Sequence, residues 1–534
     1  MKKLLSFLLA ITLLITPCIS SSAYSNPSSF DARDLGWVTS VKSQGTSGSC
    51  WAFSAISAIE SDYIAKGYGN KFNTDFSEAY LIWFGQNTLL NKESYLAYGD
   101  GWESNSPYTA GGNWLNAMSA FESGSGIAYE KDYPYNSNQS LMGNYPETDR
   151  FNNGCDIIIE NTVIFQSDET ENIKEWIKKH GSATLNYHCD DTLLNRSSNG
   201  YAYFSGNQTV TSNHSVAVIG WDDNYSSSNF GKYKPSTNGA WLCKNSWGTQ
   251  WGENGYFWIS YEEKSIYTFE GYSVLKTDKC SNKYSYNGVT CHTGFSTSAD
   301  ILIANVFTAQ KDENISHVTL STFDNDSNVT VSVYTNLPAN FKNPTEGTLA
   351  SSVNATYKNP GYYTIKLPQV LPVKNNSKFA ITISFSSDEE VCCYPMENDE
   401  HFKSRKGESF IRYNDTWYTA EELNLNNAYL GVITEAAHNY SKSQEIKPSC
   451  STNGYIVYSC QNCSSSYITS QSATGHSFGE WEITKEATTS NTGLKQRFCN
   501  NCDASEDEII PKKDTIFTQI IKSIKNFFSS LFKF

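Results

Sequence analysis

Hydrophobic residues near the start of the chain recur at helical spacing. The positions that share one helical face after Cys50 are Ala52, Ile56, Ile59 and Tyr63, and Gly67 ends the run. Further along, His214 leads into an apolar run that ends at Trp221, which is typical of a strand buried on both faces. The first part of the chain therefore contains both a helix and a buried strand.

The pattern changes over residues 279–437 to short β-rich segments divided by Asn, Asp, Ser, Gly and Pro. The strands expected there are 301–307, 318–323, 329–335, 362–367 and 379–385. Regular short strands with turn residues between them predict a β-sandwich.

Both ends of the chain carry apolar segments. Two lysines, an apolar run over 4–15 and small residues at 21–23 predict a signal peptide over residues 1–23. At the other end, residues 512–534 place Ile516, Ile520, Ile524, Phe527 and Leu531 at helical spacing among lysines. This predicts an amphipathic helix, either lying peripherally on an anionic membrane or docked on the chain's own domains.

Residues 438–511 contain a tandem repeat. Gly454 and Gly493, Cys460 and Cys499, and Cys463 and Cys502 are each 39 residues apart, and His438 and His476 are 38 apart. In the first copy His438, Cys450, Cys460 and Cys463 offer four ligands for a structural zinc ion. In the second copy Thr489 replaces the residue equivalent to Cys450, so that site lacks a ligand. Disulfides are the alternative, which secretion slightly favours.

Composition restricts the partners. The 534 residues exceed one domain, and a net charge of −15 with a pI near 5.1 argues against nucleic acid. Fourteen cysteines are compatible with disulfides, but their pairing stays open. Acidic clusters at 324–326 and 388–390 offer oxygen ligands for calcium, although solvated turns are the favoured explanation.

Three separate segments carry candidate catalytic chemistry. Cys50 lies at the first turn of the predicted helix, where unpaired N–H groups and the helix dipole favour a thiolate. His214 supplies an imidazole that can take and return a proton near neutral pH, and Asn245 can orient it. A buried structural cysteine is the alternative for Cys50 alone, but the three together indicate a nucleophile, a base and an orienting group.

The segments containing these residues resemble the papain family of cysteine peptidases over about 30–262. The motifs that carry the resemblance are Gln44 to Phe53, Asn213-His214, Asn245-Ser246-Trp247-Gly248, Phe76-Ser77-Glu78, Ala110-Gly111-Gly112-Asn113 and Tyr133-Pro134-Tyr135. The resemblance implies a two-lobed α+β fold over residues 24–278, with a helical lobe and a β lobe. It also implies that Gln44 stabilises the oxyanion, that Trp247 shields the histidine, and that Gly111, Gly112 and Asn213 contact substrate.

The chain also departs from the papain pattern. Ser47 stands where papain has a disulfide cysteine, and Asn213 stands where papain has an acid. His214 and Asn245 follow Cys50 by 164 and 195 residues, compared with about 130–150 in the family. We therefore expect insertions over 188–212 and 222–238 that form surface loops near the active site.

The arrangement of the downstream segments resembles bacterial surface cysteine peptidases with a lectin-like domain after the protease. That resemblance implies a glycan or cell-wall ligand for residues 279–437, although a domain that only supports the peptidase is the alternative. The sequence thus predicts a secreted or surface-associated cysteine endopeptidase that cleaves proteins or peptides through a Cys50 thioester. It requires no cofactor for catalysis, with structural zinc or calcium as added options. The alternatives are an adhesin with an idle peptidase domain and a transpeptidase.

Overall fold

The computed structural model describes most of the chain in two compact units, Met1–Glu435 and Ala436–Phe534. The described residues are 26–87, 104, 106–123, 125, 127–146, 149, 156–206, 210–277, 282–286, 294–386, 391–397, 404–437, 439–461 and 466–531. The predicted signal peptide lies outside them, as do His438, Cys463 and the acidic cluster at 388–390.

Helix α1 (Cys50–Ala65) is the centre of the first unit. It begins at Cys50, and it ends before Gly67, which has a φ of +75°. Helices α2 (Glu78–Gln86) and α3 (Trp114–Glu122) pack against it in a shared hydrophobic core. The predicted face of Ala52, Ile56, Ile59 and Tyr63 is buried, and so is every other residue from Trp51 to Ile64. Three of the polar residues have partners in other segments: Ser54 meets Ser215, Glu60 meets Thr39, and Asp62 meets His180.

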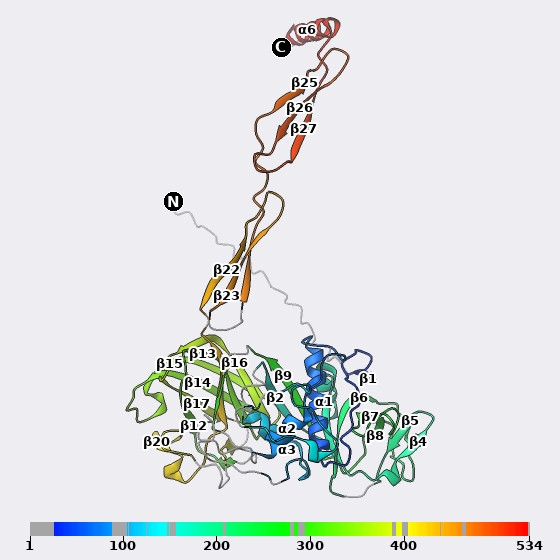
Figure 1. Ribbon diagram of the computed structural model, residues 1–534, viewed down its shortest axis with the longest axis vertical. Helices are drawn as coiled ribbons and strands as arrows, with labels where there is room; N and C mark the ends of the chain where they lie inside the picture. Colours follow the sequence, from blue (N-terminus) through cyan, green and yellow to red (C-terminus); the bar gives the residue numbers. More distant parts are fainter. Residues whose placement is uncertain are drawn as a thin grey trace, which may run out of the picture. The chain divides into compact units, whose positions relative to one another are not determined.

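The β lobe is an antiparallel sheet that lies beside α1 (Figure 1). Its strands run in the order β2-β9-β3-β6-β7-β8, with β1 (Ser29–Asp31) paired to β6. Their bounds are β2 Ile157–Gln166, β3 Ala183–Tyr187, β6 His214–Asp222, β7 Ala240–Lys244, β8 Tyr256–Ser260 and β9 Thr268–Lys276. Helix α5 (Thr170–His180) packs against this sheet. The predicted α+β fold with a helical lobe and a β lobe is therefore present.

The two insertions form more than surface loops. Strand β5 (Gly200–Tyr203) pairs in parallel with β8, and β4 (Asn195–Ser197) follows it at the edge of the sheet. Behind them Ala202, Phe204, Tyr225, Phe230 and Ala240 form a small hydrophobic core of their own. The expectation of surface loops was thus wrong, because the aromatic residues of both insertions give them a core to bury.

Two sheets packed face to face form a β-sandwich over the second segment. One layer has the order β10-β21-β13-β16, and the other has the order β15-β14-β17-β12-β19-β20. The bounds are β10 Asn282–Ser285, β12 Ile301–Thr308, β13 Glu313–Thr322, β14 Ser327–Leu337, β15 Thr348–Tyr357, β16 Gly361–Val373, β17 Lys378–Ser386, β19 Ser409–Tyr413, β20 Thr416–Thr419 and β21 Leu430–Ala436. A separate pair consists of β11 (Gly294–Thr297) and β18 (Cys392–Pro395). Short 3-10 helices are η1 Gln139–Leu141, η2 Asp191–Leu193, η3 Ser227–Asn229, η4 Pro344–Glu346 and η5 Glu421–Leu423.

The sandwich and the β lobe share one continuous sheet. Strand β16 pairs with β2, with Gly361 opposite Val163 and Tyr362 opposite Thr162. A Cβ atom at Gly361 would lie 2.0 Å from the carbonyl oxygen of Thr162, so the close approach requires glycine. The half-buried Lys283 adds a second tie by donating to the backbone carbonyls of Phe121 and Glu122 at 2.8 Å. The two segments therefore form one folded unit.

The second unit consists of two small sheets and a helix. The sheets are β22 (Tyr440–Ile446), β23 (Gly454–Cys460) and β24 (Ser466–Gln471), and then β25 (Glu482–Lys485), β26 (Gly493–Phe498) and β27 (Ser505–Ile510). Helix α6 (Ile516–Leu531) has no buried residue. Among the described residues, no helix has the length and apolar character that crossing a membrane requires.

Candidate active site

Cys50 is the first residue of α1 and is half-buried. The backbone N–H of Ser215, the second residue of β6, lies close enough to the Cys50 sulfur to lower the pKa of the thiol. The hydroxyl oxygens of Ser54 and Ser215 are 2.7 Å apart, so the same helix and strand are also joined through side chains. The start of α1 is thereby held against the start of β6.

His214 is the first residue of β6, and its imidazole is directed by Asn245. The ring Nε2 lies 2.8 Å from Asn245 Oδ1, which also accepts the backbone N–H of Ser246 at 2.8 Å. An atom that accepts from a backbone N–H must be the amide oxygen, so Nε2 of the neutral ring carries the hydrogen. Nδ1 is then left with a lone pair that can accept a proton.

Aromatic rings enclose this imidazole. Trp247 stacks on His214 with 4.6 Å between the ring centroids, and Tyr187 meets it edge-on at 5.8 Å. Trp251 supports Trp247 in an edge-to-face contact at 5.1 Å. The residue His214 is consequently only 7% exposed.

Gln44 is buried close to the same group of residues. Its Oε1 accepts the hydroxyl of Ser246 at 2.6 Å, and its Nε2 donates to the carbonyl of Ser47 at 2.6 Å. Because an amide nitrogen has two hydrogens, one remains for another acceptor. Ser246 therefore fixes the orientation of Gln44 while its neighbour Asn245 holds the imidazole.

Tyr135 is a positioning residue to which the sequence assigned no role. Its hydroxyl donates to the carbonyl of Gln44 at 2.8 Å and lies 3.2 Å from the hydroxyl of Ser49. Its ring packs edge-on against Phe53 at 4.8 Å. The Tyr133-Pro134-Tyr135 motif was the available signal, but only the fold shows that it supports the loop before Cys50.

Ser47, which replaces a disulfide cysteine of papain, keeps a tether at this point. Its buried hydroxyl donates to the carbonyl of Tyr108 at 2.8 Å. A hydrogen bond therefore holds the loop before Cys50 where papain uses a covalent link.

The predicted substrate-contacting residues lie in different surroundings. Gly111 has a φ of +76° and no atom within 4 Å of an added Cβ, whereas a Cβ on Gly112 would meet the Trp51 indole at 2.5 Å. The Asn213 side chain is bound to the Cys189 backbone, accepting its N–H at 2.7 Å and donating to its carbonyl at 3.2 Å. Any substrate contact by Asn213 is therefore left to its backbone.

Burial governs the protonation of the two reactive groups. Burial raises the pKa of the Cys50 thiol, although the N–H groups of Ser215, Trp51 and Cys50 itself lower it. Burial lowers the pKa of His214 to about 4, against a small rise from Asn245. The helix terminus thus acts in the expected direction but does not prevail, and each group by itself is neutral at pH 7.

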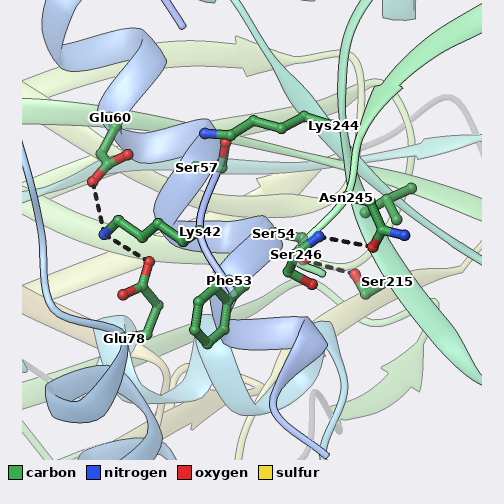
Figure 2. A pocket seen from close by; sticks show the side chains of 11 residues that line it. Lys42, Phe53, Ser54, Ser57, Glu60, Glu78, Ser215, Lys244, Asn245 and Ser246 are labelled. Carbon is green, nitrogen blue, oxygen red and sulfur yellow. Dashed lines mark hydrogen bonds and ion pairs between the residues drawn. The ribbon is translucent and has the colours of Figure 1, made fainter. Parts of the chain in front are cut away.

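Charged side chains line the same small cavity as Asn245 (Figure 2). Lys42 lies between Glu60 at 3.4 Å and Glu78 at 2.9 Å, around a cavity of about 20 Å³. Lys244, directly before Asn245, donates to Thr39 at 3.0 Å, and burial lowers its pKa to about 8. These contacts anchor the end of β7 to α1 and α2.

The structure also brings together a group of metal-ligating residues that the sequence did not predict, while His438 and Cys463 of the predicted first-copy site lie outside the described residues. Among the described residues, the ligand atoms of Cys450, His476, Cys499 and Cys502 lie within 4.8 Å of one another. Cys450 therefore meets residues of the second copy, because it occupies the turn at the far end of the first small sheet. For the predicted calcium ligands at 324–326, Asp324 is engaged with the backbone N–H of Cys393 at 2.6 Å.

Comparisons with known proteins agree with this architecture. Residues 26–277 match the family model described as papain family cysteine protease, and residues 283–434 match the model described as lectin like domain. The first segment is thus a papain-family cysteine protease domain, and the second is a lectin-like domain. Papain-family enzymes need no cofactor for catalysis, because cysteine and histidine supply the nucleophile and the base.

Individual proteins of known sequence or structure are similar to this chain. The chain is 26% identical to the cysteine protease and lectin-like domains of Cwp84, a surface layer associated protein of Clostridium difficile, with a TM-score of 0.62 over 77% of this chain and 90% of that one. Cysteine proteinase A of Leishmania mexicana is 30% identical over 45% of this chain and 56% of that protein. Ananain of Ananas comosus is 28% identical over 46% and 60%, respectively. The matches span little more than half the length of these curated relatives.

Proposed function

We propose that this protein is a cysteine endopeptidase that hydrolyses peptide bonds in proteins or peptides. The observation that carries the proposal is the convergence of Cys50 with the start of β6, where His214 is held by Asn245. The family match and the similarity to a solved cysteine protease with a lectin-like domain support it. Gln44 lies in the same site with one amide hydrogen to spare.

The reaction follows from the arrangement of these groups. Cys50 Sγ attacks the carbonyl carbon of the peptide bond while its proton passes to Nδ1 of His214. The negative charge that develops on the carbonyl oxygen is stabilised by Gln44 Nε2–H and the backbone N–H of Cys50. The C–N bond then breaks, the amine leaves with the proton from His214, and a thioester remains. Water, deprotonated by His214, cleaves the thioester and releases the acid and the free thiol.

Proton transfer from the thiol to the imidazole creates two opposite charges. Burial by itself raises the pKa of Cys50 and lowers that of His214. The thiolate and the imidazolium stabilise each other in a water-poor site, which opposes the effect of burial. Trp247 helps to keep water away from the imidazole.

Labelling with a thiol-directed epoxide tests the proposal. The full chain should be labelled at Cys50 and should cleave a peptide library, and Cys50→Ala should lose both properties. Cys189→Ala is the matched control, because Cys189 is another half-buried cysteine near Cys50 whose pKa is raised to about 11 by burial. A wild-type chain that neither labels nor cleaves would favour an adhesin with an idle peptidase domain. Added amines that outcompete water for the acyl group would instead indicate a transpeptidase.

The lectin-like domain is proposed to bind a glycan or a cell-wall component. The family match supports a carbohydrate ligand, and the shared sheet keeps that domain in one unit with the protease. Glycan-array binding by the full-length Cys50→Ala variant, which cannot cleave, tests this directly. No binding to any glycan or wall fragment would favour a purely supporting role.

We propose a location outside the cell, with retention at the cell surface. The related Cwp84 is a surface layer associated protein, and residues 1–23 have the pattern of a signal peptide. The exposed apolar residues of α6, such as Ile516 and Phe517, suit peripheral binding to an anionic membrane. Deletion of residues 514–534 should release the protein from the cell envelope fraction, and an unchanged distribution would rule out this anchor.

A further inference from the structure

The two small sheets of the second unit lack the apolar core that normally holds a domain together. The buried apolar residues in the described part of this unit are Ala436, Cys450, Cys460, Ala487 and Cys499. None of them belongs to a hydrophobic core cluster. Sheets of this size need a metal ion or a covalent cross-link for stability.

The contact between the two sheets brings four ligand residues together. Cys450 lies in the turn between β22 and β23, and its carbonyl accepts the backbone N–H of Gly475 at 3.1 Å. His476 is the next residue, so the chain enters the second copy beside Cys450. Cys499 and Cys502 follow β26 and complete a group of three sulfurs and one imidazole.

Distances within the group match tetrahedral coordination. The sulfurs of Cys450 and Cys499 are 3.8 Å apart, and Cys502 Sγ is 3.2 Å from His476 Nδ1. Two Zn–S bonds of about 2.3 Å at a tetrahedral angle place their sulfurs about 3.8 Å apart. The sulfur–nitrogen distance expected for zinc is about 3.6 Å, so the imidazole needs to move by a few tenths of an ångström. A disulfide requires sulfurs at about 2.05 Å and leaves the histidine without a role.

The types of ligand in this group of four residues indicate which metal it suits. Three thiolates and one imidazole form a closed, soft ligand set that suits structural zinc. The backbone N–H of Asn501 lies 3.5 Å from Cys499 Sγ, a contact that orients and stabilises a metal-bound thiolate. Cys450 and Cys499 are buried, so the ion would replace part of the missing core.

We propose that Cys450, His476, Cys499 and Cys502 bind one structural zinc ion that joins the two repeats. The ligand from the first copy completes the site of the second. The position equivalent to Cys450 in the second copy, which is Thr489, is then not required to be a cysteine. In the second copy the backbone N–H of Lys513 donates to the Thr488 carbonyl at 3.0 Å, and the equivalent bond in the first copy runs from Thr474 to Ser449 at 2.9 Å. After Thr474 the chain enters the second copy, whereas after Lys513 it leads into α6.

Metal analysis of the full chain tests the proposal. We expect bound zinc in protein purified without chelators, and a tetrahedral thiolate spectrum after exchange for Co²⁺. Cys450→Ser and Cys502→Ser should each remove one metal ion per chain. The double variant should lose no more than either single variant, because both thiolates bind the same ion. Epoxide labelling at Cys50 shows that the first unit of each variant is folded.

Two further variants distinguish a metal site shared by the two copies from separate metal sites within each copy. Cys460→Ser is the matched control from the first copy, and it should leave the ion bound by Cys450 and Cys502 in place. Thr489→Cys should add no metal and should not rescue Cys450→Ser. Loss of the same ion in Cys450→Ser and Cys460→Ser would overturn the proposal, as would rescue by Thr489→Cys. A wild-type chain without metal, or a Cys450–Cys499 disulfide found by peptide mapping, would overturn it as well.

Discussion

Replacement of Trp247 by alanine tests how burial controls His214. The indole stacks on the imidazole at 4.6 Å, and His214 is 7% exposed. Burial is the largest cause of a His214 pKa of about 4, compared with 6.5 for an unperturbed histidine. The difference corresponds to about 3 kcal/mol at 1.36 kcal/mol per pKa unit.

The substitution should remove only part of this effect. Water would reach one face of the ring, while Tyr187 still meets it edge-on at 5.8 Å. We expect the pKa of His214 to rise from about 4 to about 5, because hydration of the imidazolium is partly restored. His214 acts as a base in its neutral form, so the acid limb of the kcat/KM profile should move upward by the same amount.

The assay is a pH profile of kcat/KM with a fluorogenic peptide amide. Trp251→Ala is the matched control, since Trp251 contacts Trp247 at 5.1 Å and has no ring contact with His214 among those described. That variant should lose some activity but keep the acid limb near pH 4. An acid limb that stays near pH 4 in Trp247→Ala would refute the reasoning that the indole excludes water from the imidazole.

Three other variants test separate parts of the structure. Gln44→Ala should lower kcat by roughly 10²–10³ with little change in KM, measured by steady-state kinetics, because an oxyanion donor is removed; an unchanged kcat would exclude that role. Tyr135→Phe keeps the ring but loses a 2.8 Å hydrogen bond worth about 1 kcal/mol, so kcat/KM should fall roughly fivefold, and a wild-type value would show that the loop is held without it. Gly361→Val forces a side chain against the Thr162 carbonyl, so calorimetry should show a lower Tm or separate unfolding of the protease and lectin-like domains; an unchanged single transition would contradict the continuous sheet.

The local motifs pointed to the candidate catalytic residues and the element types because each signal is contained in a short segment. Cys50 begins a helix and His214 begins a buried strand, as the spacing of apolar residues indicates. The strands expected at 301–307 and 379–385 are β12 and β17 with nearly the same bounds. A short apolar run bounded by turn residues suffices to indicate a buried strand, because its length and composition lie within the segment itself.

The sequence pattern failed where polar residues are buried with distant partners. Asp62 in α1 reads as a solvent-facing residue, yet it is fully buried, with His180 Nδ1 at 2.6 Å and the Val274 N–H at 2.6 Å. Glu60 is buried in the same way by Thr39 at 2.5 Å and Lys42 at 3.4 Å. These partners are distant along the chain, so helical periodicity does not contain them.

The metal ligands illustrate the same limit in a repeat. Comparison of the copies pairs Cys450 with Thr489, and a site built within one copy then seems to have lost a ligand. The fold places the half-site of His476, Cys499 and Cys502 at one end of the second sheet and Thr489 in the turn at the other end. A ligand supplied across the joint makes one thiol per junction sufficient, and the second copy is followed directly by α6. The substitution at Thr489 is thus what a copy without an adjoining repeat permits, and the site itself remains complete.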